Sequence, residues 1–254
     1  GGGSPSAMLG GYFPPLPEEP SYAGFSRDPL APPPAPYVHP RVFFAPEELP
    51  ALRERLRSGT AARVGMEDLR SLLAEGYPPA AMAAGNLSLA EVDAALAQRL
   101  VSEAFRCLID ADREAARRLG QQLESLADEM RAALQSYSGK AGGWVLGAAS
   151  YDESDTWGTH HHGVVLKVGA ALMYDFLYPY LAASTRQKVR EALSLATAGT
   201  WSVGMDAVPA APAATSSQLP SLTGDLVLNL LAIKGEDGFD EGVFERAAKA
   251  YGAW

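Results

Sequence analysis

The chain has 254 residues, of which 47% are hydrophobic, and this is enough for one large domain or two small ones with a sizeable core. Its formal net charge of −9, from 30 acidic and 21 basic residues, argues against nucleic acid or an anionic membrane surface as the main partner. Cys107 is the only cysteine, so the chain by itself forms no disulfide and no cysteine-based zinc site.

The N-terminal region differs in composition from the rest of the chain. Residues 1–38 hold most of the prolines, including Pro32-Pro33-Pro34, and show neither helical nor strand periodicity. They predict an extended arm or linker, followed by a helical domain over residues 39–254. No apolar run approaches the roughly 20 residues of a membrane-spanning helix, so we expect no membrane span.

Two helices are predicted directly after the arm. Pro46 suits a first helical turn, leucines follow it at helical spacing, and Gly59 ends the pattern. A second helix is predicted over residues 62–75, before a turn that contains Pro78 and Pro79.

A helical hairpin is predicted next. Ser88 and Glu91 form a capping-box pattern, and an apolar stripe at helical spacing follows as far as Leu108. After Asp110 a second amphipathic stripe runs to Leu134. The two stripes predict antiparallel helices that pack together.

The second half of the chain repeats one order of helices. Residues 164–177 are apolar around the whole circumference, which predicts a helix buried on all sides. A capping-box pattern at Ser184 and Gln187 then starts an amphipathic helix. Residues 222–233 and 240–251 repeat this order of apolar and amphipathic helices. The repeat predicts an all-α chain that forms an incomplete α/α-toroid of stacked helical hairpins.

Stacked hairpins bring the loops that lead into successive inner helices to the same end of the ring, so a site is expected there. The first loop, residues 151–162, concentrates carboxylates, aromatic rings and histidines, and the second, residues 213–221, offers hydroxyls and an amide. The candidate catalytic residues are His160, His161, His162 and Gln218, and the candidate substrate-binding residues are Tyr151, Glu153, Trp157 and Ser217.

The chemistry of these loops allows several interpretations. A neutral imidazole accepts a proton, a protonated one pairs with a sugar carboxylate, and Trp157 offers a face for stacking on a sugar. Glu153 and Asp155 could instead form a glycosidase-type acid–base pair. A purely structural alternative is a helix start that Asp155 or Thr159 caps. No metal site is expected, because consecutive helical residues point about 100° apart and three adjacent histidines cannot share one ion. No cofactor is expected either.

Two segments carry a family resemblance. The segment from His39 to Leu49 (HPRVFFAPEEL) resembles the opening of heparinase II/III-like and alginate-lyase-like toroid domains. The segment from Ala171 to Tyr178 (ALMYDFLY), with the residues that follow it, resembles an inner–outer hairpin of the same group, which includes dermatan-sulfate epimerase-like proteins.

The resemblance implies a toroid that acts on uronate-containing polysaccharides by β-elimination or C5 epimerisation. Both reactions need one group to neutralise the sugar carboxylate and another to remove the neighbouring proton. The family places an Asn or His at about the position of Gln218, and its tyrosine base and β-sandwich domain lie farther along. We therefore expect the chain to be the N-terminal part of a larger protein, with a further domain or chain completing the toroid.

Three further expectations remain. The partner implied by the resemblance is an acidic polysaccharide, and the implied location is secreted, periplasmic or extracellular. Asn86-Leu87-Ser88 is a glycosylation pattern that matters only in a secreted chain. The alternative function is a non-catalytic glycan-binding or structural assembly subunit that keeps the toroid scaffold.

Overall fold

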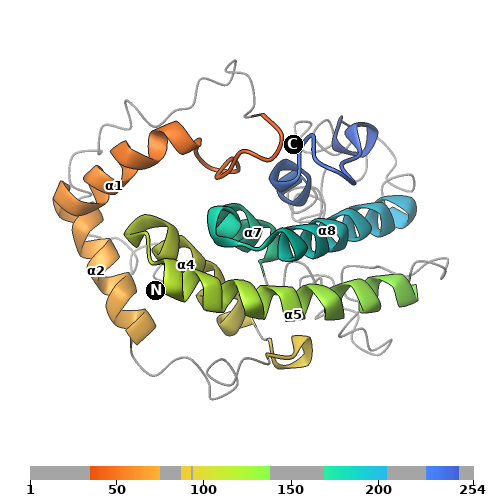
Figure 1. Ribbon diagram of the computed structural model, residues 1–254, viewed down its shortest axis with the longest axis horizontal. Helices are drawn as coiled ribbons and strands as arrows, with labels where there is room; N and C mark the ends of the chain where they lie inside the picture. Colours follow the sequence, from red (N-terminus) through yellow and green to blue (C-terminus); the bar gives the residue numbers. More distant parts are fainter. Residues whose placement is uncertain (1–34, 75–86, 93, 138–168, 205–226, 246–254) are drawn as a thin grey trace, which may run out of the picture. The chain divides into compact units, whose positions relative to one another are not determined.

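The computed structural model describes residues 35–74, 87–92, 94–137, 169–204 and 227–245 (Figure 1). These described residues lie in helices and turns, with no strand among them, which confirms the all-α class. Within the same ranges, no helix combines the length and the apolar character needed to cross a membrane. The predicted proline-rich arm lies almost entirely outside the described residues.

The first two helices form as the sequence predicts. A short 3₁₀ turn, η2 (Pro46–Glu48), leads into α1 (Leu49–Ser58), and α2 (Thr60–Ala74) follows. The Glu48 carboxylate accepts a hydrogen bond from the backbone N–H of Ala45 at 2.6 Å and so satisfies one donor at the helix start. Gly59 ends α1 in an extended conformation, with its N–H donating to the carbonyl of Arg55.

The predicted hairpin is formed by α4 (Ala94–Asp110) and α5 (Arg113–Tyr137), which pack against each other. Glu91 accepts a hydrogen bond from the N–H of Ser88 at 2.9 Å, as the capping-box pattern predicts. The turn that it closes is the 3₁₀ element η3 (Leu89–Glu91), and α4 starts three residues later. Asp112 precedes α5 and accepts a hydrogen bond from the N–H of Ala115 at 3.0 Å.

The apolar helix of the second hairpin is α7 (Ala170–Leu177), which continues into the 3₁₀ turn η5 (Tyr178–Tyr180). Every residue of α7 except Leu172 is buried, as its apolar circumference predicts. Gly169 precedes it with a positive φ of 61°, and Val101 of α4 occupies the space that a side chain there would need. This glycine therefore permits the close approach of α4 and α7.

The outer helix of this hairpin is α8 (Ala183–Gly204). It begins one residue before Ser184, and Gln187 donates to Glu191 at 2.9 Å within the helix. Val189 and Leu193 are fully buried, as the amphipathic pattern predicts. Beyond α8, residues 227–232 and 241–245 are also helical.

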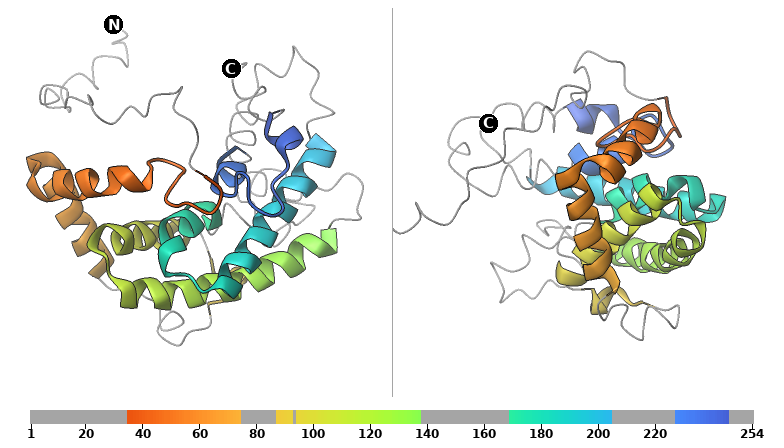
Figure 2. Two further views of the ribbon diagram at one scale, coloured as in Figure 1. Left: turned by 45° about the horizontal axis from the view of Figure 1, so that its top comes forward. Right: turned by 90° about the vertical axis from the view of Figure 1, so that its left-hand side faces the viewer.

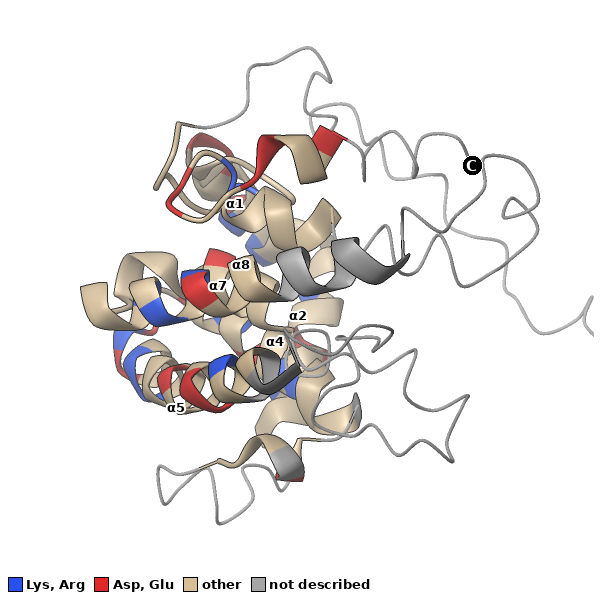
Figure 3. Cartoon of the chain, turned by 90° about the vertical axis from the view of Figure 1, so that its right-hand side faces the viewer, with Lys and Arg blue, Asp and Glu red and all other residues tan. Residues whose placement is uncertain are grey.

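The corresponding helices of the two hairpins pack against each other. The first helices, α4 and α7, contact each other, and the second helices, α5 and α8, lie side by side (Figures 1 and 2). One apolar core joins both hairpins with the N-terminal segment, and Leu100, Leu123, Met130, Met173, Leu177 and Leu193 are among its members. Acidic and basic residues are interspersed along the outer side of α5 (Figure 3).

Candidate functional site

The site residues predicted from sequence lie outside the described residues. Tyr151, Glu153, Trp157, His160, His161 and His162 fall within residues 138–168, and Ser217 and Gln218 fall within residues 205–226. Their proposed roles therefore remain predictions. Among the described residues, no group of three or more His, Cys, Asp or Glu side chains is placed to hold a metal ion.

A buried polar network joins segments that are far apart in the sequence, and we call it the His39 cluster. His39 Nδ1 lies 2.7 Å from Asp175 Oδ1 of α7, and His39 Nε2 lies 2.7 Å from Glu236 Oε1 in the turn after residue 232. The Tyr174 hydroxyl donates to Glu236 Oε2 at 2.6 Å. Arg41 completes the cluster, with Nη1 donating to the Lys234 carbonyl at 2.6 Å. The cluster thus ties residues 39–41 to α7 and to the segment that contains Glu236.

Both carboxylates of this cluster accept further hydrogen bonds. Asp175 accepts from the backbone N–H groups of Arg41 (2.8 Å) and Val42 (3.1 Å), one on each carboxylate oxygen. Glu236 accepts from Tyr174 and from the N–H of Tyr37 (3.2 Å). The His39 ring lies between the two carboxylates, with one ring nitrogen within hydrogen-bond distance of each.

The pKa values of Glu236 and Tyr174 respond to this environment. Burial alone would raise the pKa of Glu236, but hydrogen bonds from His39 and Tyr174 and the charges of His39 and Arg41 outweigh it and hold the pKa below its usual value. Burial raises the pKa of Tyr174, and the hydrogen bond to Glu236 raises it further. Glu236 is therefore charged and Tyr174 neutral at physiological pH.

The His39 cluster is closed to solvent. The side chains of His39, Asp175 and Glu236 are each 0% exposed, and the His39 ring stacks on the Tyr178 ring with centroids 4.0 Å apart. A catalytic acid or base must reach its substrate, which these side chains cannot do. The cluster is therefore a structural element, although its residue types are those of acid–base chemistry.

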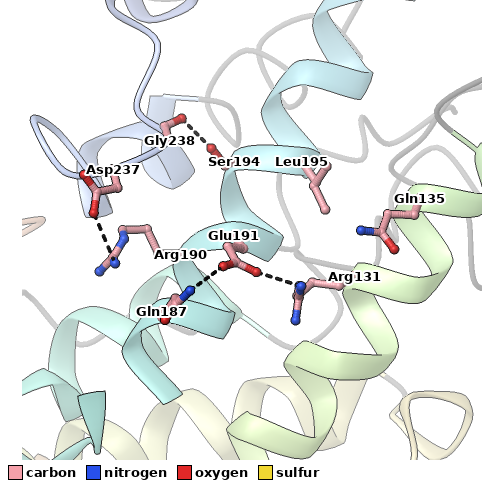
Figure 4. Close-up of a pocket in the computed structure, with 9 residues that line it drawn as sticks. All are labelled: Arg131, Gln135, Gln187, Arg190, Glu191, Ser194, Leu195, Asp237 and Gly238. Carbon is pink, nitrogen blue, oxygen red and sulfur yellow. Dashed lines mark hydrogen bonds and ion pairs between the residues drawn. The ribbon is translucent and has the colours of Figure 1, made fainter. Parts of the chain in front are cut away.

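An open cavity of about 560 Å³ lies between α5 and α8 (Figure 4). We call it the α5–α8 cavity, and its volume is typical of small-molecule sites. Arg131 and Gln135 of α5 line one side, and the turn at Asp237 and Gly238 lines another. The residues that α8 contributes are Gln187, Arg190, Glu191, Ser194 and Leu195.

Two arginine–carboxylate pairs organise this cavity. Arg131 Nη2 lies 2.7 Å from Glu191 Oε2, and Gln187 donates to the other oxygen of Glu191 at 2.9 Å. Arg190 Nη2 lies 3.6 Å from Asp237, whose side chain is 84% exposed. The lining therefore carries two positive and two negative charges. Because the Asp237 pair is long and exposed, a bound anion could replace Asp237 at little cost.

Arg190 connects the cavity to the His39 cluster. Its side chain is only 13% exposed, and its Nη1 lies 3.8 Å from Glu236 Oε2. Burial lowers the pKa of Arg190, but a hydrogen bond with Tyr174 and the charge of Glu236 raise it above its usual value. On the other wall, Nε of Arg131 is buried without a hydrogen-bond partner. The cavity thus contains the Arg190 guanidinium, which interacts with Glu236 and Tyr174, and the Arg131 guanidinium, whose Nε has no hydrogen-bond partner.

The sequence did not identify these residues as a site. The amphipathic pattern of α8 places Arg190 on the water-facing side, yet its guanidinium turns inward to Glu236. One signal was available, because Asp175 is the only charged residue in an otherwise apolar helix. A charged residue in such a position is rarely buried without a partner, so it predicts a buried counterpart elsewhere in the chain.

Comparison of the chain with protein-family models, with curated protein sequences and with solved structures found no match in any of the three.

Proposed function

We propose that this chain is a toroid domain that binds an acidic, uronate-containing polysaccharide, with the α5–α8 cavity taking one of its sugars. The observation that carries the proposal is the cavity lining, where two arginines, each paired with a carboxylate, lie beside two side-chain amides and a hydroxyl. Guanidinium groups pair with carboxylates through two parallel hydrogen bonds, and amides and hydroxyls suit sugar hydroxyls.

The contacts of the two family-like segments support the proposal. His39 and Arg41 belong to the first segment, Asp175 belongs to the second, and they meet in the His39 cluster. The sequence features behind the resemblance to heparinase II/III-like and alginate-lyase-like domains are therefore parts of one structural unit. The packing of α4 on α7 and of α5 on α8 is also what an α/α-toroid requires.

The proposed chemistry is proton abstraction next to the sugar carboxylate, which leads to β-elimination or C5 epimerisation. An arginine of the cavity would neutralise the carboxylate and so acidify the neighbouring C–H bond. His160, His161, His162 and Gln218 are the proposed catalytic residues, and Tyr151, Glu153, Trp157 and Ser217 are proposed to bind the substrate. A secreted, periplasmic or extracellular location belongs to this proposal.

A non-catalytic glycan-binding subunit is the second candidate. The described lining of the α5–α8 cavity contains no histidine or tyrosine, and its two carboxylates are paired with arginines. A cavity of this composition can hold a sugar without supplying a strong base. The two candidates therefore share the ligand and differ in the reaction.

The discriminating experiment is incubation of the 254-residue chain with alginate, heparan sulfate, dermatan sulfate and hyaluronan. Unsaturated product would be followed by ultraviolet absorbance, C5-proton exchange by NMR in deuterated water, and binding by calorimetry. Binding with either reaction supports the enzyme, and binding alone supports the second candidate. If none of the four polysaccharides binds, the proposed function is wrong.

Substitution of Arg131 by Gln tests the cavity itself. The change removes a charged donor but keeps the side chain polar, so oligouronate affinity should fall roughly tenfold or more. Arg63→Gln is the matched control, because Arg63 forms an exposed ion pair of the same 2.7 Å length with Glu67 on α2, away from the cavity. Equal affinities of the two variants would remove the α5–α8 cavity from the site.

A further inference from the structure

A second cavity lies at the other end of α5, and we call it the Arg113 cavity. It has a volume of about 790 Å³ and is open to solvent. Arg113 and Arg117 of α5, Arg53 of α1 and Tyr180 of η5 line it, together with Glu114. The lining residues thus carry three positive charges and one negative charge, in a chain with a net charge of −9. This local excess of positive charge contrasts with the balanced charges of the α5–α8 cavity.

The positive charge is not neutralised by the described part of the chain. The Glu114 carboxylate pairs with Arg118 at 2.6 Å, on the side of α5 next to the cavity. No described carboxylate pairs with Arg113 or Arg117. These two residues are four apart on one helix, so their like charges lie side by side and repel each other. An anion bound between them would relieve this repulsion.

The other lining groups suit a sugar acid. Arg53 is held in place, because its Nη2 donates to the carbonyl of Leu108 near the end of α4 at 2.6 Å. Its Nε is buried without a hydrogen-bond partner. Tyr180 is half-buried and offers both an aromatic face and a hydroxyl. The cavity therefore combines one hydrogen-bonded arginine and two exposed arginines with an aromatic surface.

The two cavities lie on the same face of α5. Arg113 and Arg131 are 18 residues apart, which corresponds to about five turns, and the same spacing separates Arg117 from Gln135. At the rise of an α-helix, the two residues of each pair are roughly 27 Å apart along α5. Between them, Lys188 of α8 bridges Glu124 (3.0 Å) and Asp128 (2.7 Å). This distance is too long for one sugar but suits two separate groups of an extended chain.

We propose that the Arg113 cavity is a second subsite, which binds a carboxylate group of the same uronate polysaccharide at a distance from the α5–α8 cavity. This inference rests on the proposed function. The guanidinium groups of Arg113 and Arg117 hold the carboxylate, and the Tyr180 ring contacts the sugar. Because Arg113 and Arg117 are exposed, the contribution of this subsite decreases as the salt concentration rises.

The test compares the 254-residue chain with the double variant Arg113→Gln/Arg117→Gln. Both side chains are exposed, and Gln has a helix propensity close to that of Arg, so the fold should be unaffected. The matched control is Arg57→Gln/Arg63→Gln, which removes two exposed positive charges from α1 and α2. Circular dichroism melting checks that all three proteins are folded.

The probes are long and short alginate oligouronates and an uncharged oligosaccharide of the same length, measured by calorimetry at low and high salt. We expect the double variant to bind long oligouronates at least tenfold more weakly than the control does, with little change for the short ones. If the double variant and the control bind long oligouronates equally, the second subsite is wrong and the proposed function stands. If the unmodified chain binds no oligouronate, both are wrong.

Discussion

The His39 cluster and the α5–α8 cavity use the same kinds of side chain for different purposes. Both pair arginines with carboxylates, and Arg190 of the cavity lies 3.8 Å from Glu236 of the cluster. In the cluster the side chains of His39, Asp175 and Glu236 are 0% exposed, whereas in the cavity Arg131 is 31% and Glu191 39% exposed. Access to water, and not residue type, separates a structural network from a candidate binding site.

This difference has an energetic basis. The cost of desolvation offsets much of the attraction within a buried ion pair. Removal of one partner, however, leaves the other charge buried and unpaired. An exposed pair contributes little and is easily exchanged for a ligand. The comparison therefore predicts large stability effects in the cluster and small ones at the cavity.

The largest effect is expected for Asp175→Ala. The change leaves His39 and the N–H groups of Arg41 and Val42 without their acceptor, so the free energy of unfolding should fall by roughly 3–5 kcal/mol. Ala is a better helix former than Asp, so helix propensity does not explain a loss. Urea denaturation measures the effect.

Asp128→Ala is the matched control on α5, because Asp128 is 48% exposed and pairs with Lys188 at 2.7 Å. Its removal should change the free energy of unfolding by less than about 1 kcal/mol. Similar losses in Asp128→Ala and Asp175→Ala would contradict the distinction between buried and exposed pairs.

A smaller effect is expected for Tyr174→Phe. The change removes only the hydroxyl that donates to the charged Glu236 at 2.6 Å and keeps the ring in the core. A hydrogen bond to a charged group contributes roughly 1.5–3 kcal/mol, and urea denaturation should show a loss of that size. Tyr180→Phe, in a half-buried ring of η5, serves as the control and should lose less.

The pH dependence of stability provides the finest test. The pKa of Glu236 is lower in the folded chain than its usual 4.5, so the unfolded chain binds a proton more readily. The stability from this group is therefore present above about pH 4.5 and is lost as the pH falls through the folded pKa. Each unit by which the folded pKa lies below the unfolded pKa corresponds to about 1.4 kcal/mol of stability. Urea midpoints measured down to acidic pH should fall less steeply in Glu236→Gln than in the unmodified chain.

An acid slope in Glu236→Gln equal to that of the unmodified chain would show that Glu236 contributes nothing to the loss of stability at low pH.

Local patterns predicted most of the described helices. The spacing of apolar residues located α1, α2, α4 and α5, and the apolar circumference of residues 164–177 predicted the burial of α7. Capping signals were less accurate, because Glu91 closes a 3₁₀ turn before α4 and α8 starts one residue before Ser184. These signals act within one turn of helix, where tertiary packing can shift the boundary.

The sequence by itself determined the all-α class and the order of the buried helix α7 and the amphipathic helix α8. Only the tertiary structure decided that His39 meets Asp175 across 136 residues and Glu236 across 197, and that Arg190 turns inward. It also decided which arginines share a cavity. Helical periodicity arises from contacts between neighbours in the chain, whereas charge pairing depends on which distant segments fold together.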